Sequence, residues 1–234
     1  IGTSFLFFSN SNKLLLISNK HVLFGGTDIR VTFNVLDEEK TGPSLGKMYQ
    51  LTLQDYMKVY HEHPDPRIDI ACLNISEIIP KIAGKVYYHN FDESLLANFQ
   101  EEELDVSQRV TFVGYPDNRF DIVHNLPIIR SGLIASHPKV DFNGIKQFII
   151  DAQVFPGSSG SPVMINLTYE NYKNGTIVIE KPKIRLLGIV AATMIRNSRV
   201  VPLPSNYPSL LSQEVIGLGI VFKSTALKEL IEKV

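Results

Sequence analysis

An all-β fold of the antiparallel sandwich or barrel type is predicted for this 234-residue chain by two observations. First, strand-length segments rich in β-branched and aromatic residues recur along most of the chain, and long helical segments do not alternate with them. Second, the 44% of residues that are hydrophobic suffice for one large core or two modest ones. The predicted strands are residues 3–8, 14–17, 29–35, 49–53, 68–75, 109–113, 128–134, 147–150, 184–193 and 217–222.

Helical periodicity is confined to two segments. The C-terminal segment 224–234 places Ala226, Leu227 and Leu230 on one apolar face, with Ser224 or Thr225 as its cap, which predicts a docked helix. The second segment, about 91–103, also shows the helical period and divides the chain into two halves. The proline-rich stretch Pro202 to Pro208 predicts a surface loop.

Composition excludes several classes of partner. With 23 basic and 24 acidic residues, the net charge of -1 supplies no basic surface for nucleic acid and no polybasic membrane anchor. The apolar runs are strand-sized, far below the roughly 20 residues of a membrane helix. Cys72 is the only cysteine, so no intrachain disulfide can form, which favours a reducing compartment such as the cytoplasm. The chain begins at Ile1, and we expect an excised domain of a larger polypeptide or a processed form.

A crowded turn carries the strongest chemical signal. Around Ser159, the residues Gly157, Ser158, Gly160 and Ser161 are all small. A nucleophilic hydroxyl must project from a tight bend, and two convergent backbone N–H groups must meet the oxyanion that forms when it attacks. Gly157 and Ser159 are the expected donors. The alternative is an ordinary Gly/Ser turn between strands.

A serine hydroxyl needs a neighbouring base, and a histidine oriented by a carboxylate is the usual solution. His21 directly follows an apolar strand and is the candidate base, the alternative being a structural histidine. Asp69 lies between two isoleucines and is the candidate carboxylate, because a buried carboxylate needs a partner. Asp65, in the preceding loop, is a less constrained alternative.

Four motifs resemble the trypsin-like, chymotrypsin-fold serine peptidases, and most closely the bacterial high-temperature-requirement (HtrA-type) protease domains. They are Gly2-Thr3-Ser4-Phe5, Asn19-Lys20-His21-Val22, Asp69-Ile70-Ala71-Cys72-Leu73 and Gly157-Ser158-Ser159-Gly160-Ser161-Pro162. The order His, Asp, Ser is also that of the family. The resemblance implies two six-stranded antiparallel β-barrels, about 1–90 and 108–222, joined by a linker of about 91–107 and followed by a C-terminal helix of about 224–234. The active site would lie in the cleft between the barrels.

The function implied by this resemblance is that of a serine endopeptidase that hydrolyses proteins or peptides through an acyl-enzyme, with no cofactor and no metal. Gln153 stands where relatives place the floor of the specificity pocket, and Gly219 where they place its wall. Ala191, Ala192 and Thr193 correspond to the strand that pairs with substrate. The neutral floor predicts an uncharged residue at the substrate position before the cleaved bond (P1). Ser158 replaces the aspartate that pairs with a newly formed N-terminus in secreted relatives, so activation by that ion pair is not expected.

Three alternatives remain open. His61 and His63 alternate as on one strand face and could hold a metal, although a solvated loop is favoured. Cys72 is expected to be a small core residue rather than a nucleophile. A trypsin-like fold can also serve as a non-catalytic module that binds peptides or partner proteins.

Overall fold

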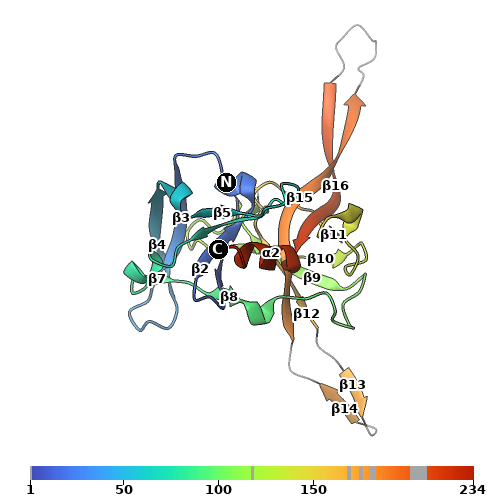
Figure 1. The fold of residues 1–234 in the computed structure, drawn as a ribbon, viewed down its shortest axis with the longest axis horizontal. Helices are drawn as coiled ribbons and strands as arrows, with labels where there is room; N and C mark the ends of the chain where they lie inside the picture. The colour runs from blue at the N-terminus through green and yellow to red at the C-terminus, as the bar shows by residue number, and fades with distance from the viewer. Residues whose placement is uncertain (1, 117–118, 168–169, 174–175, 180–182, 201–209) are drawn as a thin grey trace.

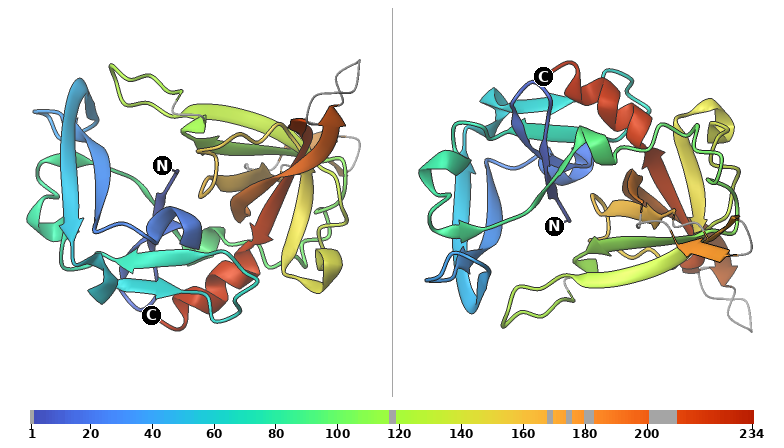
Figure 2. Two further views of the ribbon diagram at one scale, coloured as in Figure 1. Left: turned by 90° about the horizontal axis from the view of Figure 1, so that it is seen from above. Right: turned by 90° about the horizontal axis from the view of Figure 1, so that it is seen from below.

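Two β-rich halves lie side by side in the computed structural model, which describes residues 2–116, 119–167, 170–173, 176–179, 183–200 and 210–234 (Figures 1 and 2). The C-terminal helix lies across the junction between the halves. The all-β prediction is therefore confirmed.

The C-terminal half is a closed six-stranded antiparallel barrel, in the order β10-β11-β16-β15-β12-β9. Its strands are β9 (Arg109–Gly114), β10 (Ile128–Ile134), β11 (Gln147–Asp151), β12 (Pro162–Asn166), β15 (Ile184–Val200) and β16 (Leu210–Lys223). Phe112, Phe148 and Ile150 fill its interior with exposures of 1% or less. Burial of such side chains is the main force that closes the barrel.

The N-terminal half consists of two sheets. The larger has the order β5-β6-β2-β1-β8 and the smaller the order β4-β3-β7. The bounds are β1 (Phe5–Phe8), β2 (Leu14–Ser18), β3 (Asp28–Leu36), β4 (Pro43–Gln54), β5 (Tyr60–Glu62), β6 (Ala71–Asn74), β7 (Val86–Tyr87) and β8 (Asn90–Asp92). Short helices connect them: α1 (Lys20–Leu23), η1 (Tyr56–Lys58) and η2 (Ile79–Lys81).

The expected closed six-stranded barrel is not found in the described part of the N-terminal half, which corrects this one detail of the predicted fold. Within the described residues, β3 and β4 pair with each other and with β7, but not with the larger sheet. The outer strand β8 pairs with β1 in parallel, so it ends that sheet instead of continuing an antiparallel meander. Side chains alone join the two sheets, since Leu16, Leu73 and Phe33 share one core cluster.

The linker 91–103 does not form the helix that its periodicity suggested. It contains one 3₁₀ turn, η3 (Glu93–Leu95), and the rest is extended or irregular. The apolar residues of the segment serve two different cores: Phe91 packs edge-on against Phe5 at 5.3 Å, whereas Phe99 packs against Phe148 in the barrel. A helix would present these side chains on one face, so the tertiary packing overrides the local period.

The C-terminal helix is confirmed as α2 (Ser224–Ile231). Its buried residues Ala226, Leu227 and Leu230 join a cluster that contains Phe7 from the N-terminal half and Ile189 from the barrel. This shared core fixes the two halves relative to each other. Among the described helices, none is long and apolar enough to cross a membrane.

Strands β15 and β16 are much longer than predicted. They extend beyond the barrel as a projecting two-stranded arm (Figure 1). A second hairpin, β13 (Glu170–Lys173) and β14 (Thr176–Ile179), projects in the opposite direction. The loop predicted at Pro202 to Pro208 lies outside the described residues.

Candidate active site

Strand pairing brings His21 and Asp69 together. The last residue of β2, Ser18, lies opposite the first residue of β6, Ala71. His21 follows Ser18 by three residues and Asp69 precedes Ala71 by two. Both residues therefore lie just beyond the same end of the β2–β6 pair, close to each other. Asn19 turns the chain from β2 into α1, and its carbonyl accepts the N–H groups of Val22 and Leu23.

The histidine and the carboxylate make two hydrogen bonds. His21 Nδ1 lies 2.5 Å from Asp69 Oδ2, and the His21 backbone N–H donates to Asp69 Oδ1 at 3.2 Å. A carboxylate only accepts, so this bond assigns a proton to Nδ1, and in a neutral imidazole Nε2 is then the acceptor. Asn19, fully buried, donates from Nδ2 to the Asp69 carbonyl at 2.5 Å and holds that residue's backbone in place. The role of Asn19 was not foreseen from the sequence.

The loop that carries Ser159 is tied to the N-terminal half. Thr3 donates its N–H to the Ser159 carbonyl at 2.8 Å and its hydroxyl to the Gly157 carbonyl at 2.9 Å. Ser18 in turn donates to the Thr3 carbonyl at 2.6 Å. Ser18 precedes His21 by three residues, so the same contacts place the Ser159 loop beside the histidine segment. Thr3 belongs to the first of the four motifs and Ser18 directly precedes the second, but the sequence did not reveal these contacts.

Two glycines permit this approach. Gly157 and Gly160 both have φ of +88°, a conformation that favours glycine. A Cβ atom on Gly160 would lie 1.9 Å from the Thr3 carbonyl oxygen and 2.4 Å from Ser18 Oγ. The close contact between the halves therefore requires the absence of a side chain at position 160.

Ser159 itself points to a carbonyl. Its hydroxyl donates to the Ala191 carbonyl at 3.0 Å, and no hydrogen bond within the described residues joins it to His21. The N–H groups of Gly157 and Ser159 donate to no backbone group in the described part of the chain.

The remaining predicted residues lie on neighbouring elements. Thr193 and Gly219 are cross-strand partners in β15 and β16, Gly219 is buried, and Ala192 is exposed. A Cβ on Gly219 would lie 2.6 Å from a methyl of Val154, so glycine lets β16 pack on the segment after β11. Gln153 is exposed.

A comparison with protein families identifies this chain with the trypsin-like peptidase domain over residues 2–168, well over half of its length. The chain belongs to that family. A comparison with curated proteins gave no match. The matched range contains His21, Asp69 and Ser159 together with the loop segments that carry them.

An arginine that the sequence did not indicate lies beside the Ser159 loop of this trypsin-like peptidase domain. The guanidinium of Arg130, from β10, lies 4.9 Å from the ring centre of Phe155 and 5.7 Å from that of Phe112. Phe155 is two residues before Gly157. The two aromatic rings thus place the guanidinium group near the loop.

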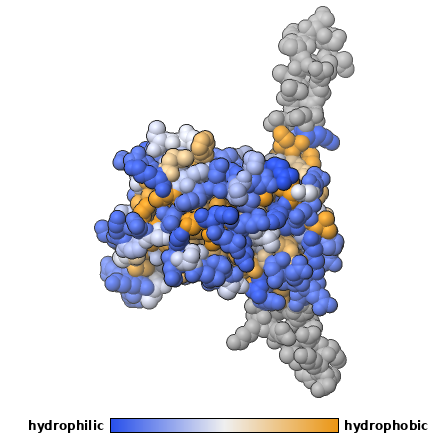
Figure 3. Space-filling view, viewed as in Figure 1, coloured by the Kyte–Doolittle hydropathy of each residue, from blue (hydrophilic) through white to orange (hydrophobic). Residues whose placement is uncertain are grey.

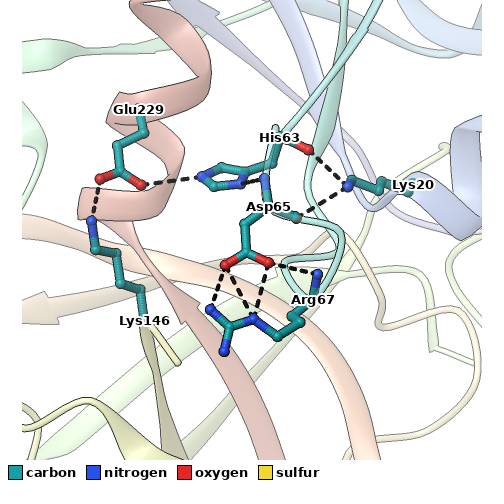
Figure 4. A network of polar contacts seen from close by, with 6 residues as sticks. All are labelled: Lys20, His63, Asp65, Arg67, Lys146 and Glu229. Carbon is teal, nitrogen blue, oxygen red and sulfur yellow. Dashed lines mark hydrogen bonds and ion pairs between the residues drawn. The ribbon is translucent and has the colours of Figure 1, made fainter. Parts of the chain in front are cut away.

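His63 corrects the expectation of a solvated loop at residues 61–63, because it is only 3% exposed. Its Nδ1 accepts the Asp65 N–H at 3.0 Å, and its Nε2 lies 3.2 Å from a carboxylate oxygen of Glu229 in α2 (Figure 4). Both ring nitrogens are thus engaged within the chain, and Lys20, next to His21, donates to the His63 carbonyl at 2.9 Å. The network links α2 to the segment that presents the candidate base.

The Asp65 carboxylate is bound by Arg67 at 2.7 Å, and no hydrogen bond among the described residues joins it to His21. The side-chain and backbone hydrogen bonds of Arg67 lower the pKa of Asp65 to about 2. Between the two candidate carboxylates, the hydrogen bonds favour Asp69. Cys72 is fully buried, and burial raises the pKa of its thiol to about 12, which suits a core residue.

Replacing Glu229 with glutamine is expected to lower the melting temperature at pH 7 by about 1 to 3 °C. Burial alone would raise the pKa of Glu229, but the hydrogen bonds and charges of Lys146 and His63 outweigh it and lower that pKa. A carboxyl group whose pKa is lower in the folded state stabilises the fold at pH values above its pKa in the unfolded chain. This stabilisation is lost as the pH falls through the pKa of the folded state. The difference between wild type and variant should close below about pH 4.

Thermal unfolding between pH 3 and 8 measures this effect. Glu232→Gln is the matched control, because among the described residues that carboxylate forms an ion pair only with Lys228, at 3.9 Å, and both side chains are exposed at the end of the same helix. An equal pH dependence in both variants would contradict a specific role for the Glu229 network.

Replacing Gly160 with alanine is expected to lower the free energy of unfolding by at least about 3 kcal/mol. The new methyl group would clash with the Thr3 backbone and force a positive φ on alanine. Urea denaturation measures the change. Gly84→Ala is the control, because nothing lies within 4 Å of its added Cβ and its φ is ordinary; a comparable midpoint for both variants would rule out the tight junction.

Proposed function

We propose that this trypsin-like peptidase domain is a serine endopeptidase, with Ser159 as nucleophile, His21 as general base and Asp69 as the group that orients the histidine. The observation that carries the proposal is the 2.5 Å bond between His21 Nδ1 and Asp69 Oδ2. It leaves Nε2 free to accept a proton, which is the state that a general base needs. The tie of the Ser159 loop to Thr3 and Ser18 supports it further.

The proposed reaction is acyl transfer. Ser159 Oγ leaves the Ala191 carbonyl and turns to His21, Nε2 takes its proton, and Oγ attacks the peptide carbonyl carbon. The N–H groups of Gly157 and Ser159 stabilise the oxyanion. His21 then gives the proton to the departing amine, and water, activated by the same histidine, hydrolyses the ester and restores the serine.

In the proposed reaction the Ala191 carbonyl, once Ser159 no longer donates to it, becomes an acceptor for the substrate. Once Ser159 has turned away, that oxygen can accept a backbone N–H from the substrate, so binding of a peptide favours the reactive position of the serine. The proposed enzyme comprises the two halves and α2 as a single peptidase domain, 1–234, in which each half supplies part of the site.

We propose that the enzyme prefers an uncharged P1 residue, with Gln153, Ala192, Thr193 and Gly219 lining the pocket. No acidic side chain is among them, and the positive charge of Arg130 disfavours lysine or arginine nearby. Cleavage of a peptide library tests this specificity. A dominant Lys/Arg preference would contradict it, and a dominant Asp/Glu preference would instead assign Arg130 to the pocket.

Labelling with a fluorophosphonate probe tests the catalytic assignment. In the wild-type protein, Ser159 Oγ should attack the phosphorus of the probe, displace its fluoride and form a phosphonyl ester, which peptide mass spectrometry locates. His21→Ala should react far more slowly, and heat-unfolded protein should not react. Absence of labelling in the folded protein would favour a peptide-binding module without catalysis.

A further inference from the structure

One edge of β15 changes its surroundings along its length. From Ile184 to Ile189 this edge pairs with β12, and the N–H and C=O groups of Val190 bond to Ser161 and Gly160 of the nucleophile loop. From Ala191 to Val200 the described residues place no strand on it, while β16 continues along the opposite edge as far as the Val200–Leu210 pair. The edge that begins at the candidate active site thus continues along the projecting arm with no described strand beside it (Figure 1).

The free edge remains regular where the arm leaves the barrel. Thr193 lies opposite Gly219 and Ile195 opposite Val215, so only Met194 separates the pairs on β15, whereas residues 216–218 separate them on β16. The extra residues of this bulge, with Gly217 at φ +79°, belong to β16. The other irregularity of this strand pair lies between Val190 and Ala192, where β15 carries one extra residue, Ala191. Beyond Thr193 the row of backbone N–H and C=O groups on β15 runs on without an insertion.

Apolar side chains lie at the base of the arm. Ile195 and Val215, which are cross-strand partners, are 47% and 42% exposed, and Ile216 is 46% exposed. Figure 3 shows hydrophobic surface at this position, next to the arm. Exposed strand edges with apolar side chains favour pairing with another extended chain.

We propose that the free edge of β15 from Met194 onward binds the substrate upstream of P3, as an added antiparallel strand that continues from the active site along the arm. The proposal rests on the serine endopeptidase function proposed above. The segment that binds to this edge is the extended N-terminal part of the substrate, because the edge leads away from Ala191, whose carbonyl accepts the Ser159 hydroxyl. A substrate side chain that lies beside Ile195 should be apolar.

The geometry requires a period of two along the substrate. In an extended chain successive N–H groups point to opposite sides, so only every second residue of the peptide can bond to β15. Segments that are already folded into helices cannot pair in this way. The preferred substrates are accordingly unfolded or extended segments with at least six residues before the cleaved bond.

The first test uses peptides that share residues P3 to P3′ and extend stepwise to P8. The expected kcat/KM rises with each pair of added residues, and N-methylation of single backbone nitrogens upstream of P3 lowers it about five-fold at alternate positions only. A kcat/KM that is constant beyond P3, or N-methyl losses without alternation, would overturn the proposal.

The second test uses two variants of the same strand. Ile195→Asp should lower kcat/KM about five-fold for a long substrate with apolar upstream residues and leave a P3-to-P3′ substrate unchanged. Ile184→Asp is the matched control, because Ile184 is 48% exposed on β15 but lies on the part paired with β12. Equal effects of both variants, or an equal loss with short and long substrates, would overturn the assignment.

The outcomes separate this proposal from the catalytic one. If the enzyme cleaves short peptides and labels at Ser159 but shows no length dependence, the strand proposal fails and the endopeptidase stands. If nothing is cleaved, fluorescence anisotropy of the same labelled peptides decides: binding that strengthens with length and alternates with N-methylation supports the strand, and absence of binding overturns it.

Discussion

Replacing Ser159 with alanine is expected to lower kcat by about 10⁶-fold, the largest effect of any single substitution in this protein. Without Oγ no acyl-enzyme forms, and His21 and Asp69 have no hydroxyl to activate. The fold should be unchanged, because the side chain makes one hydrogen bond, to Ala191. Single-turnover and steady-state assays on a library-derived peptide measure the loss, and circular dichroism checks the fold.

Ser158→Ala is the matched control for this substitution. The neighbouring hydroxyl is 1% exposed and has no hydrogen-bond partner within the described residues, so its removal leaves no donor or acceptor unpaired. We expect normal turnover for Ser158→Ala. Turnover that survives Ser159→Ala would contradict the assignment of the nucleophile.

Replacing Asp69 with asparagine is expected to lower kcat by about 10⁴-fold at neutral pH. An amide can donate to Nδ1, which would move the imidazole proton to Nε2 and deprive Ser159 of its acceptor. The bond from the His21 backbone N–H to position 69 can persist through the amide oxygen, so the geometry should survive. The kcat/KM of the variant measured against pH, beside its melting temperature, distinguishes lost chemistry from lost structure.

Asp65→Asn is the control for the carboxylate. Its side chain binds Arg67 and not His21, so the substitution should leave kcat within about two-fold and remove only a partly exposed ion pair. If Asp65→Asn were the more damaging of the two variants, the orienting role would belong to Asp65.

The candidate site was predictable from local motifs because its chemistry requires particular residue types in short segments. A serine among small residues, a histidine at the end of an apolar strand and an aspartate between isoleucines each carry a physical reason that needs no tertiary structure. Asn19 and Thr3 were present in the motifs and Ser18 directly precedes one of them, but their contacts join residues that are distant in the sequence. Arg130 had no local signal, since its site is formed by aromatic rings from β9 and from the Ser159 loop.

In the fold, too, some features could be predicted from local sequence and others depended on contacts between distant segments. Strand-length segments rich in β-branched and aromatic residues identified most strands, and the amphipathic pattern identified α2. Helical periodicity failed at residues 91–103, because Phe91 and Phe99 pack into different cores. The arm was underestimated because its strands pair with each other beyond the core, where burial no longer shapes the sequence pattern.

The all-β class, the C-terminal helix and the identity of the residues proposed for catalysis can be predicted from the sequence, since they follow from side-chain chemistry and local periodicity. The folded chain was needed to show which sheets close, that Ser159 donates to the Ala191 carbonyl, that His63 is buried against α2 and that no described strand covers the edge of β15 that leads away from the active site. These features depend on contacts between segments far apart along the chain. No local pattern encodes such contacts, because each is decided by what the rest of the fold brings beside it.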